Sequence, residues 1–298
     1  MYAIKTYRYL RIGMASLVVC LLASVGYEHF KNPQSCWQGS LSAYYYTPAR
    51  PIFVAALFTI GVCMVVLLAY PPLHDVLLNV GGFLAVVVAV VPTPNKGSCM
   101  SVPFQAEERA ANVANNMTAF FIGAAIAMIV TVATAFSERG SATTPAADLP
   151  GPGKHDDAVR KGGVVVEALL LVGGVLWFFG FRHSFDHNAH YVSAAGLCIA
   201  IIVLVVLNAR AARSAPDQSK QHRYFLLYAL LAGAMVVGAA VILVIQAITG
   251  WHHATLVLEI LLIGCFGVFW GIQTKDLWNE AIRPAVQYRP RHEGPGLQ

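Results

Sequence analysis

One residue that could do chemistry lies inside an apolar run, where an acid is unexpected. Glu259 lies near the start of the apolar run Ala254–Gln273. It shares a helical face with His252 and Thr255, since the three stand at i, i+3 and i+7. A carboxyl group about 7–8 Å into hydrocarbon costs a few kcal/mol unless it is paired. We therefore expect Glu259 to face the interior of a helix bundle, as a functional acid or as a protonated acid bonded to a neighbouring helix. Its candidate partners are Arg50, His187, His190 and His252.

A histidine-rich segment supplies metal-ligand types at helical spacing. His183, His187 and His190 stand at i, i+4 and i+7 on one face of a helix, and imidazoles in this arrangement suit Zn²⁺. Asp186 and Ser193 lie with His190 on a neighbouring face. Two structural alternatives stay open: Asp186 caps the helix and His183 precedes it, or the histidines only form interfacial hydrogen bonds. The candidate catalytic residues are Glu259, His190, Asp186 and Ser193.

The segment from Ser40 to Arg50 is the third polar group. Its three consecutive tyrosines are typical of the head-group level of a bilayer, where an apolar ring and a hydroxyl are both solvated. Alternatively, Ser40, Ser42 and Arg50 face inward and bind an anionic head group, because guanidinium donates two bonds to phosphate. The predicted ligand-binding residues are Ser40, Ser42, Tyr44, Arg50 and His252.

The elements that must position these residues are membrane helices. The chain has 298 residues, of which 57% are hydrophobic and 12% charged, with a mean hydropathy of +0.61; soluble domains carry about 25% charged residues. Lipid must therefore solvate most of the chain. We predict an all-α polytopic bundle of about eight transmembrane helices. The predicted spans are Leu10–Tyr27, Pro51–Tyr70, Val76–Val91, Met117–Phe136, Gly163–Phe181, Ala189–Leu207, Tyr224–Ile248 and Ala254–Gln273.

The distribution of Lys and Arg predicts the orientation. With the N-terminus inside, 15 of the 20 cationic residues fall in inner segments and 5 in outer segments. This positive-inside bias predicts cytoplasmic N- and C-termini. The cations lie in membrane-flanking loops, so we predict no nucleic-acid partner. The predicted organisation is a four-helix half (1–136), a flexible linker (137–162), a second half (163–275) and a tail (276–298).

Two cysteines differ from the other four in their predicted location. Cys36 and Cys99 fall in the first two outer loops, whereas the rest fall inside helices and are expected to be packing residues. In an oxidising outer compartment we expect Cys36 and Cys99 to form a disulfide; the alternative is two thiols that never approach.

The segment Ser40–Val54 resembles the signature of an uncharacterised family of multi-pass membrane proteins common in actinobacteria. It reads SLSAYYYTPARPIFV, and Leu77–Asn79, Val91–Pro94, Asn115–Asn116 opening a helix and His190–Ala194 also resemble that family. The resemblance implies a multi-pass protein of a bacterial plasma membrane, without an assigned activity. A second resemblance is to the ceramidase/progestin-receptor superfamily of intramembrane hydrolases, which place Ser, Asp and three His around zinc. Eight expected helices and the position of the HxxxH pattern depart from that superfamily.

The sequence leaves three possible functions open. The first is a non-enzymatic membrane protein that binds a lipid or a membrane-protein partner in an outward-facing polar cavity. The second is a zinc-dependent intramembrane lipid hydrolase. The third is a small proton-coupled transporter in which Glu259 and His190 exchange protons.

Overall fold

The computed structural model describes residues 2–31, 37–94, 106–140, 154–213 and 218–280. Within these ranges the regular elements are all helical, as the apolar runs predict. They comprise eight α-helices and one 3₁₀ helix, η1. The elements are α1 (Tyr2–Lys31), η1 (Ser42–Tyr46), α2 (Arg50–Val66), α3 (Pro72–Val90), α4 (Ala106–Gly140), α5 (Lys154–Gly180), α6 (Arg182–Ala212), α7 (Gln218–Thr249) and α8 (Ala254–Asp276).

Seven of these helices are long and apolar enough to cross a membrane, judged by their length and composition. The other, α2, is apolar but has 17 residues, which is at the lower limit of about 17 for a span. The described residues thus have the features of a multi-pass membrane protein. The eight predicted spans correspond to the seven long helices and α2.

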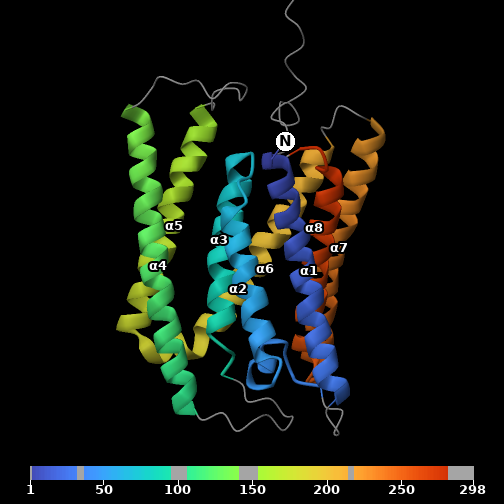
Figure 1. The fold of residues 1–298 in the computed structure, drawn as a ribbon. Helices are drawn as coiled ribbons and strands as arrows, with labels where there is room; N and C mark the ends of the chain where they lie inside the picture. Colours follow the sequence, from blue (N-terminus) through green and yellow to red (C-terminus); the bar gives the residue numbers. More distant parts are fainter. Residues whose placement is uncertain (1, 32–36, 95–105, 141–153, 214–217, 281–298) are drawn as a thin grey trace, which may run out of the picture.

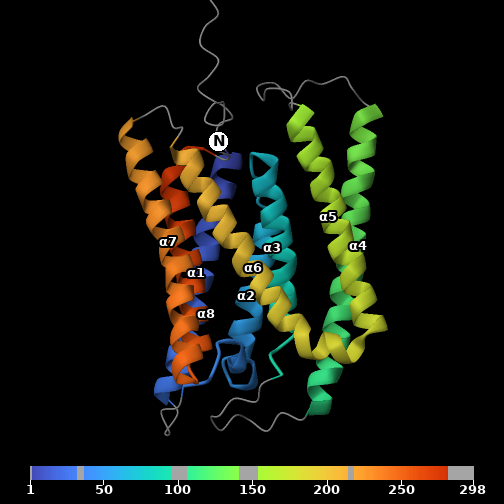
Figure 2. The same ribbon diagram turned by 180° about the vertical axis from the view of Figure 1, so that it is seen from behind.

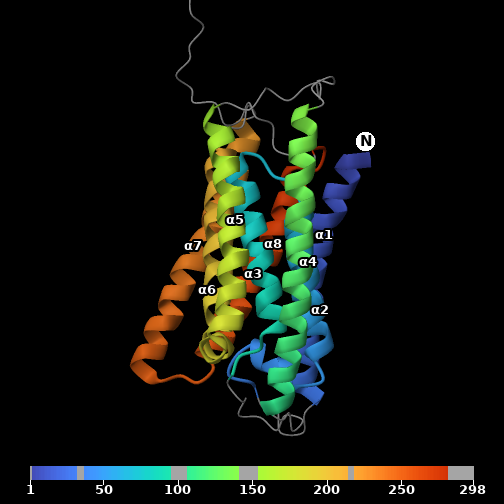
Figure 3. The ribbon, with the colours of Figure 1, turned by 90° about the vertical axis from the view of Figure 1, so that its left-hand side faces the viewer.

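Six helices form a closed ring, and two stand outside it (Figure 1). Around the ring the order is α1, α2, α3, α6, α7 and α8, with α8 packing back onto α1. Figure 2 shows α6 crossing the back of the ring obliquely, from α7 toward the base of α5. The outer pair, α4 and α5, contacts α3 and runs along one side of the molecule (Figure 3). Since α3 packs against α6, the two expected halves interlock and do not form separate units.

All the α-helices except α2 extend well beyond the apolar runs from which they were predicted, at one end or both. α4 begins at Ala106, so Asn115 and Asn116 lie inside it and do not cap it as predicted. α6 begins at Arg182, which places His183 and Asp186 within the helix and excludes the capping role for Asp186. Outside hydrocarbon a helix needs no apolar side chains, so hydropathy marks the span and not the helix ends.

Close packing of α2 on α3 brings the two backbones together at one point. A Cβ added at Gly82 would lie 2.5 Å from the carbonyl oxygen of Gly61, and one added at Gly61 would lie 2.7 Å from that of Gly82. Only glycine permits this approach, as in other helix contacts within membranes. The crossing fixes α2 and α3 as one wall of the ring interior.

Candidate functional site

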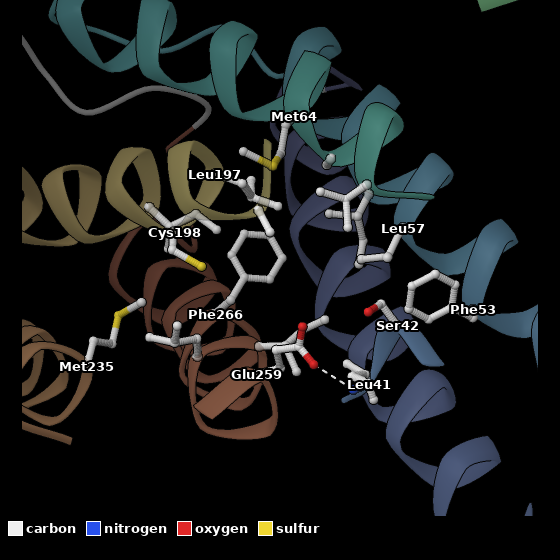
Figure 4. Close-up of a pocket in the computed structure, with 17 residues that line it drawn as sticks. Leu41, Ser42, Phe53, Leu57, Met64, Leu197, Cys198, Met235, Glu259 and Phe266 are labelled. Atoms are coloured by element: carbon white, nitrogen blue, oxygen red, sulfur yellow. Dashed lines mark hydrogen bonds between the residues drawn. The ribbon is translucent and has the colours of Figure 1, made fainter. Parts of the chain in front are cut away.

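A cavity of about 90 Å³ lies inside the helix ring, walled by α2, α3, α6, α7 and α8 and by the residues that open η1. Its lining is apolar apart from the carboxyl group of Glu259, the hydroxyl of Ser42 and the thiol of Cys198. Figure 4 shows Glu259 and Ser42 at one end of the cavity, with Met64 distant from both. An apolar cavity of about 150 Å³ stays dry and holds benzene. This smaller one has room for a few carbon atoms.

Glu259 lines the cavity from the second turn of α8 and is partly buried. Its Oε2 accepts a hydrogen bond of 2.5 Å from the backbone N–H of Leu41, a residue that is itself 5% exposed. Within the described residues, no hydrogen bond or ion pair joins Glu259 to Arg50, to His252 or to the histidines of α6. The expectation of an inward-facing acid agrees with this geometry, but its partner is a backbone amide and not the predicted side chain.

Residues 37–47, which we call the closing loop, fold against the start of α8 and close one end of the cavity. The N–H of Leu256 donates to the carbonyl oxygen of Gly39 at 3.1 Å, and Nδ1 of His253 donates to that of Gln38 at 3.3 Å. The Leu256 N–H belongs to the first turn of α8, where backbone N–H groups lack partners within the helix. With the Glu259–Leu41 bond, the cavity end is therefore held by one backbone pair and two bonds between a side chain and the backbone, all between segments far apart in sequence.

The predicted head-group residues of the closing loop bond to their own neighbours. The hydroxyls of Ser40 and Ser42 lie 3.1 Å apart, and the Ser40 Oγ also accepts from the N–H of Ala43 at 3.1 Å. Arg50 donates to the Tyr45 hydroxyl at 3.1 Å, and its guanidinium lies 4.4 Å from the centre of that ring. These contacts shape the loop, and they would compete with a bound head group.

Two of the three tyrosines are buried, whereas the head-group interpretation placed all three at the membrane surface. Tyr44 and Tyr45 are each 1% exposed because η1 turns their rings into the core. The Tyr46 hydroxyl donates to the carbonyl oxygen of Thr93 at 2.7 Å. Burial raises the pKa of Tyr44 and of Tyr46 above the ordinary value of 10.0, so both phenols stay protonated. The interfacial interpretation is therefore wrong for Tyr44 and Tyr45.

The segment that follows α3 presents three successive carbonyl groups, and each accepts a hydrogen bond from a different part of the chain. Nδ1 of His190 donates to Val91 at 2.7 Å, Arg109 donates to Pro92 at 3.0 Å, and Tyr46 donates to Thr93 at 2.7 Å. These bonds satisfy carbonyl groups of the segment just after α3, which lie beyond the helical hydrogen-bond pattern. They join α3 to α6, to α4 and to η1 at one end of the bundle.

The predicted three-histidine face divides between two environments. His183 and His187 lie with their ring centres 4.5 Å apart and their planes tilted by 41° near the exposed start of α6. His190 is 3% exposed and bonded to Val91, just after α3. Asp186 forms an ion pair of 3.0 Å with Arg182. In the part of the chain that the structure describes, no three His, Cys, Asp or Glu residues come together as a metal site. These residues do not provide the zinc ligand set that the sequence suggested.

The remaining predicted residues are also separate from one another. Ser193 is buried one turn beyond His190, and His252 is exposed before α8 begins. Cys36 and Cys99 lie outside the described residues, so their pairing stays a prediction. The other four cysteines are free thiols, among them Cys198 in the cavity wall.

Sequence reasoning missed two contributors to this end of the bundle. Arg109, counted only as an outer cation, donates to Pro92 and also to the carbonyl oxygen of Asp186 at 2.7 Å. The N–H of Leu41 gave no signal, because every residue except proline has one. The one available clue to Arg109 was its place in the loop that follows Pro92 and Pro94 at the end of the third apolar run.

Comparison of the chain with protein-family models, with curated proteins and with solved structures found no match. Both resemblances therefore stay predictions. The candidate site is accordingly the cavity with Glu259 at one end, defined by its own geometry.

Proposed function

We propose that this multi-pass membrane protein binds the apolar end of a membrane amphiphile in the cavity inside its helix ring. The observation that carries the proposal is the cavity wall, which is apolar except where Glu259, Ser42 and Cys198 contribute polar atoms. Helix bundles pack closely, and voids larger than a water molecule are few. An alkyl end would fill the apolar part, with the polar group of the amphiphile beside the Glu259 carboxyl, a hydrogen-bond acceptor.

The volume limits the part of the ligand that is enclosed. About 90 Å³ holds a few carbon atoms and not a whole lipid, so most of the amphiphile would lie between helices or in the bilayer. A neutral alcohol suits the site, since it donates to the carboxyl group without adding a buried charge. We therefore assign the ligand class as single-chain amphiphiles with a donor head group.

We also propose an orientation with the start of α1 in the cytoplasm of a bacterial plasma membrane. The 15-to-5 division of Lys and Arg supports it. The start of α1 and the end of α8 lie at one end of the bundle, and the closing loop lies at the other (Figure 1). In this orientation the Glu259 end of the cavity faces the outer side of the membrane (Figure 4).

The test is photolabelling of the purified full-length chain with a fatty alcohol that carries a diazirine near its methyl end. Peptide mapping should find label on cavity residues such as Leu197 and Met235. Ala194→Leu places a larger side chain in the cavity wall and should reduce that label severalfold. Ala195→Leu is the matched control, because Ala195 is the next residue of α6 and is exposed.

Loss of label in Ala194→Leu, with retention in Ala195→Leu, supports the proposal. Equal labelling of both variants, or label confined to residues outside the cavity wall, overturns it. Size-exclusion chromatography of each variant distinguishes loss of binding from loss of fold.

A proton-coupled carrier is a second candidate, favoured by one observation: the Glu259 carboxyl lies in a cavity wall within a helix that can span the membrane. Acids in that setting are used in proton relays. Glu259→Gln would then abolish pH-dependent flux in proteoliposomes, and unchanged flux would exclude the carrier. The zinc hydrolase draws no support from the described residues, which contain no three-ligand set.

A further inference from the structure

A second recess lies on the outer surface of the ring, between α1 and α8, far from the closing loop. It is a groove of about 660 Å³ and shares no lining residue with the cavity. Its residues come from α1, from α8 and from the turn after α8. They are Ile12, Ala15, Ser16, Val19, Gly271, Thr274, Lys275 and Trp278.

The groove has the length and lining of an acyl-chain site. From Ile12 to Val19, α1 advances about 10 Å, roughly two-thirds of one leaflet of a bilayer whose hydrocarbon core is about 30 Å thick. Gly271 leaves the α8 side open, because a Cβ added there would meet no heavy atom within 4 Å. Ile12 and Val19 are 40% and 66% exposed, so the α1 side is an apolar wall open to lipid. A chain lying along α1 would be shielded on one side and open to bulk lipid on the other.

The end of the groove is cationic and aromatic. Lys275 and Trp278 are both exposed there, and the Arg8 guanidinium lies 3.8 Å from the centre of the Trp278 ring. Arg8 also donates to the Trp278 carbonyl oxygen, so the turn after α8 holds this guanidinium at the groove end. Lys5, one turn earlier on α1, is exposed too. Trp, Lys and Arg in this arrangement are typical of the head-group level.

Two acids occur nearby, Asp276 and Glu280. Asp276 accepts a hydrogen bond from the Tyr228 hydroxyl at 3.0 Å, which ties it to α7 and away from α1. The backbone carbonyl of Glu280 accepts from Arg11, which is 2% exposed. Neither acid is among the lining residues, whereas Lys275 is. The polar end of the groove is therefore suited to an anion.

We propose that this groove binds an anionic phospholipid from the leaflet at which α1 begins. One acyl chain lies along α1 and α8 beside Gly271, and the phosphate lies near Lys275 and Arg8. Each Lys or Arg close to a bilayer surface favours an anionic over a zwitterionic lipid about fivefold. Opposite ends of the bundle thus hold different ligands, an amphiphile inside the ring and a phospholipid on its surface.

Native mass spectrometry of the full-length chain, released from detergent with equal amounts of phosphatidylglycerol and phosphatidylcholine, tests the proposal. We expect phosphatidylglycerol adducts to predominate. Gly271→Leu fills the groove and should reduce these adducts severalfold. Gly264→Leu is the matched control, because a Cβ there also meets nothing within 4 Å but the residue does not line the groove. Lys275→Gln should retain lipid and lower the preference for phosphatidylglycerol about fivefold.

Equal adduct levels in Gly271→Leu and Gly264→Leu would overturn the proposal, as would an unchanged lipid preference in Lys275→Gln. A dimer that disappears only in Gly271→Leu would assign the groove to a second copy of the chain instead. Lys275 is exposed, so its substitution leaves the fold intact and keeps the test decisive even if Gly271→Leu fails to fold.

Discussion

Replacing Glu259 by leucine keeps a side chain of similar size but removes the acceptor of the Leu41 amide. Leu41 is 5% exposed, and its N–H lies 2.5 Å from the carboxylate oxygen, so in this variant a buried donor loses its partner. Leaving a buried donor unsatisfied costs about 1–3 kcal/mol. Glutamine at the same position supplies an amide oxygen and should retain most of the bond.

The cost of about 2 kcal/mol can be converted to a melting temperature. At roughly 2–4 °C per kcal/mol for a large domain, Glu259→Leu should melt about 4–8 °C below the parent protein, and Glu259→Gln within about 2 °C of it. Thermal unfolding in detergent, followed by chromatography, measures the difference. Amide exchange should increase at Leu41 and across η1 in the leucine variant alone, since the closing loop is released there.

Two results would refute the reasoning. If both variants melt with the parent and the closing loop keeps its protection, the Glu259–Leu41 bond does not hold the loop. If both variants fall by the same amount, the negative charge rather than the acceptor is responsible, because the charge is what both variants lack.

Three further substitutions, two of them with a matched control, test the packing of the helix ring and the hydrogen bonds at the closing-loop end. His190→Phe keeps an aromatic ring but leaves the buried Val91 carbonyl after α3 without its donor, so it should lower the free energy of unfolding in detergent by about 1–3 kcal/mol. His187→Phe is the same change three residues earlier at an exposed site and should be nearly neutral. Gly82→Ala forces α2 and α3 apart, costing about 1–3 kcal/mol in the same assay. Gly173→Ala meets nothing within 4 Å and should stabilise α5 by up to about 1 kcal/mol, so equal effects of the two alanines would refute the packing argument. Tyr46→Phe should cost about 1 kcal/mol, and an unchanged melting temperature would show that its hydroxyl does not contribute to stability.

The positions of the spans were predictable because lipid imposes one rule on every helix. Apolar runs of sufficient length have no folded alternative in hydrocarbon, and each of the eight predicted spans corresponds to a helix, seven of them long and apolar enough to cross a membrane. Helix ends were not predictable in this way: α4 begins at Ala106 and not at Met117, and α2 ends at Val66 and not at Tyr70. Beyond the hydrocarbon, polar side chains permit a helix or a turn equally, and hydropathy no longer distinguishes them.

The candidate site was predictable in its residue types but not in its pairings. Glu259 faces inward as its cost in lipid requires, and helical spacing correctly placed His183 beside His187. Their partners in the fold are mostly backbone groups, such as the Leu41 amide and the Val91 carbonyl. The sequence says which side chain stands at each position. It does not say which backbone group will lie beside that side chain, because this depends on tertiary packing. The buried tyrosines follow the same logic, because their burial depends on how η1 packs against α2 and the surrounding core.

The closing loop is too firmly bonded to serve as the normal entrance to the cavity. Opening it breaks at least three hydrogen bonds, from Leu41 to Glu259, from Leu256 to Gly39 and from Tyr46 to Thr93. At a net 0.5–1.5 kcal/mol each, these bonds together hold the loop by roughly 2–4 kcal/mol, so the open form is populated about one part in thirty to one in a thousand. An amphiphile dissolved in the bilayer would instead enter between helices at the level of the cavity, where the lining side chains are apolar apart from Glu259, Ser42 and Cys198. Separating apolar side chains there exposes them to hydrocarbon, which costs little. For the proposed amphiphile, entry from the membrane is therefore favoured over entry through the closing loop. Tyr46→Phe, which loosens the loop without changing a residue of the cavity wall, should change the rate of labelling by a water-soluble probe far more than that by a membrane-dissolved one.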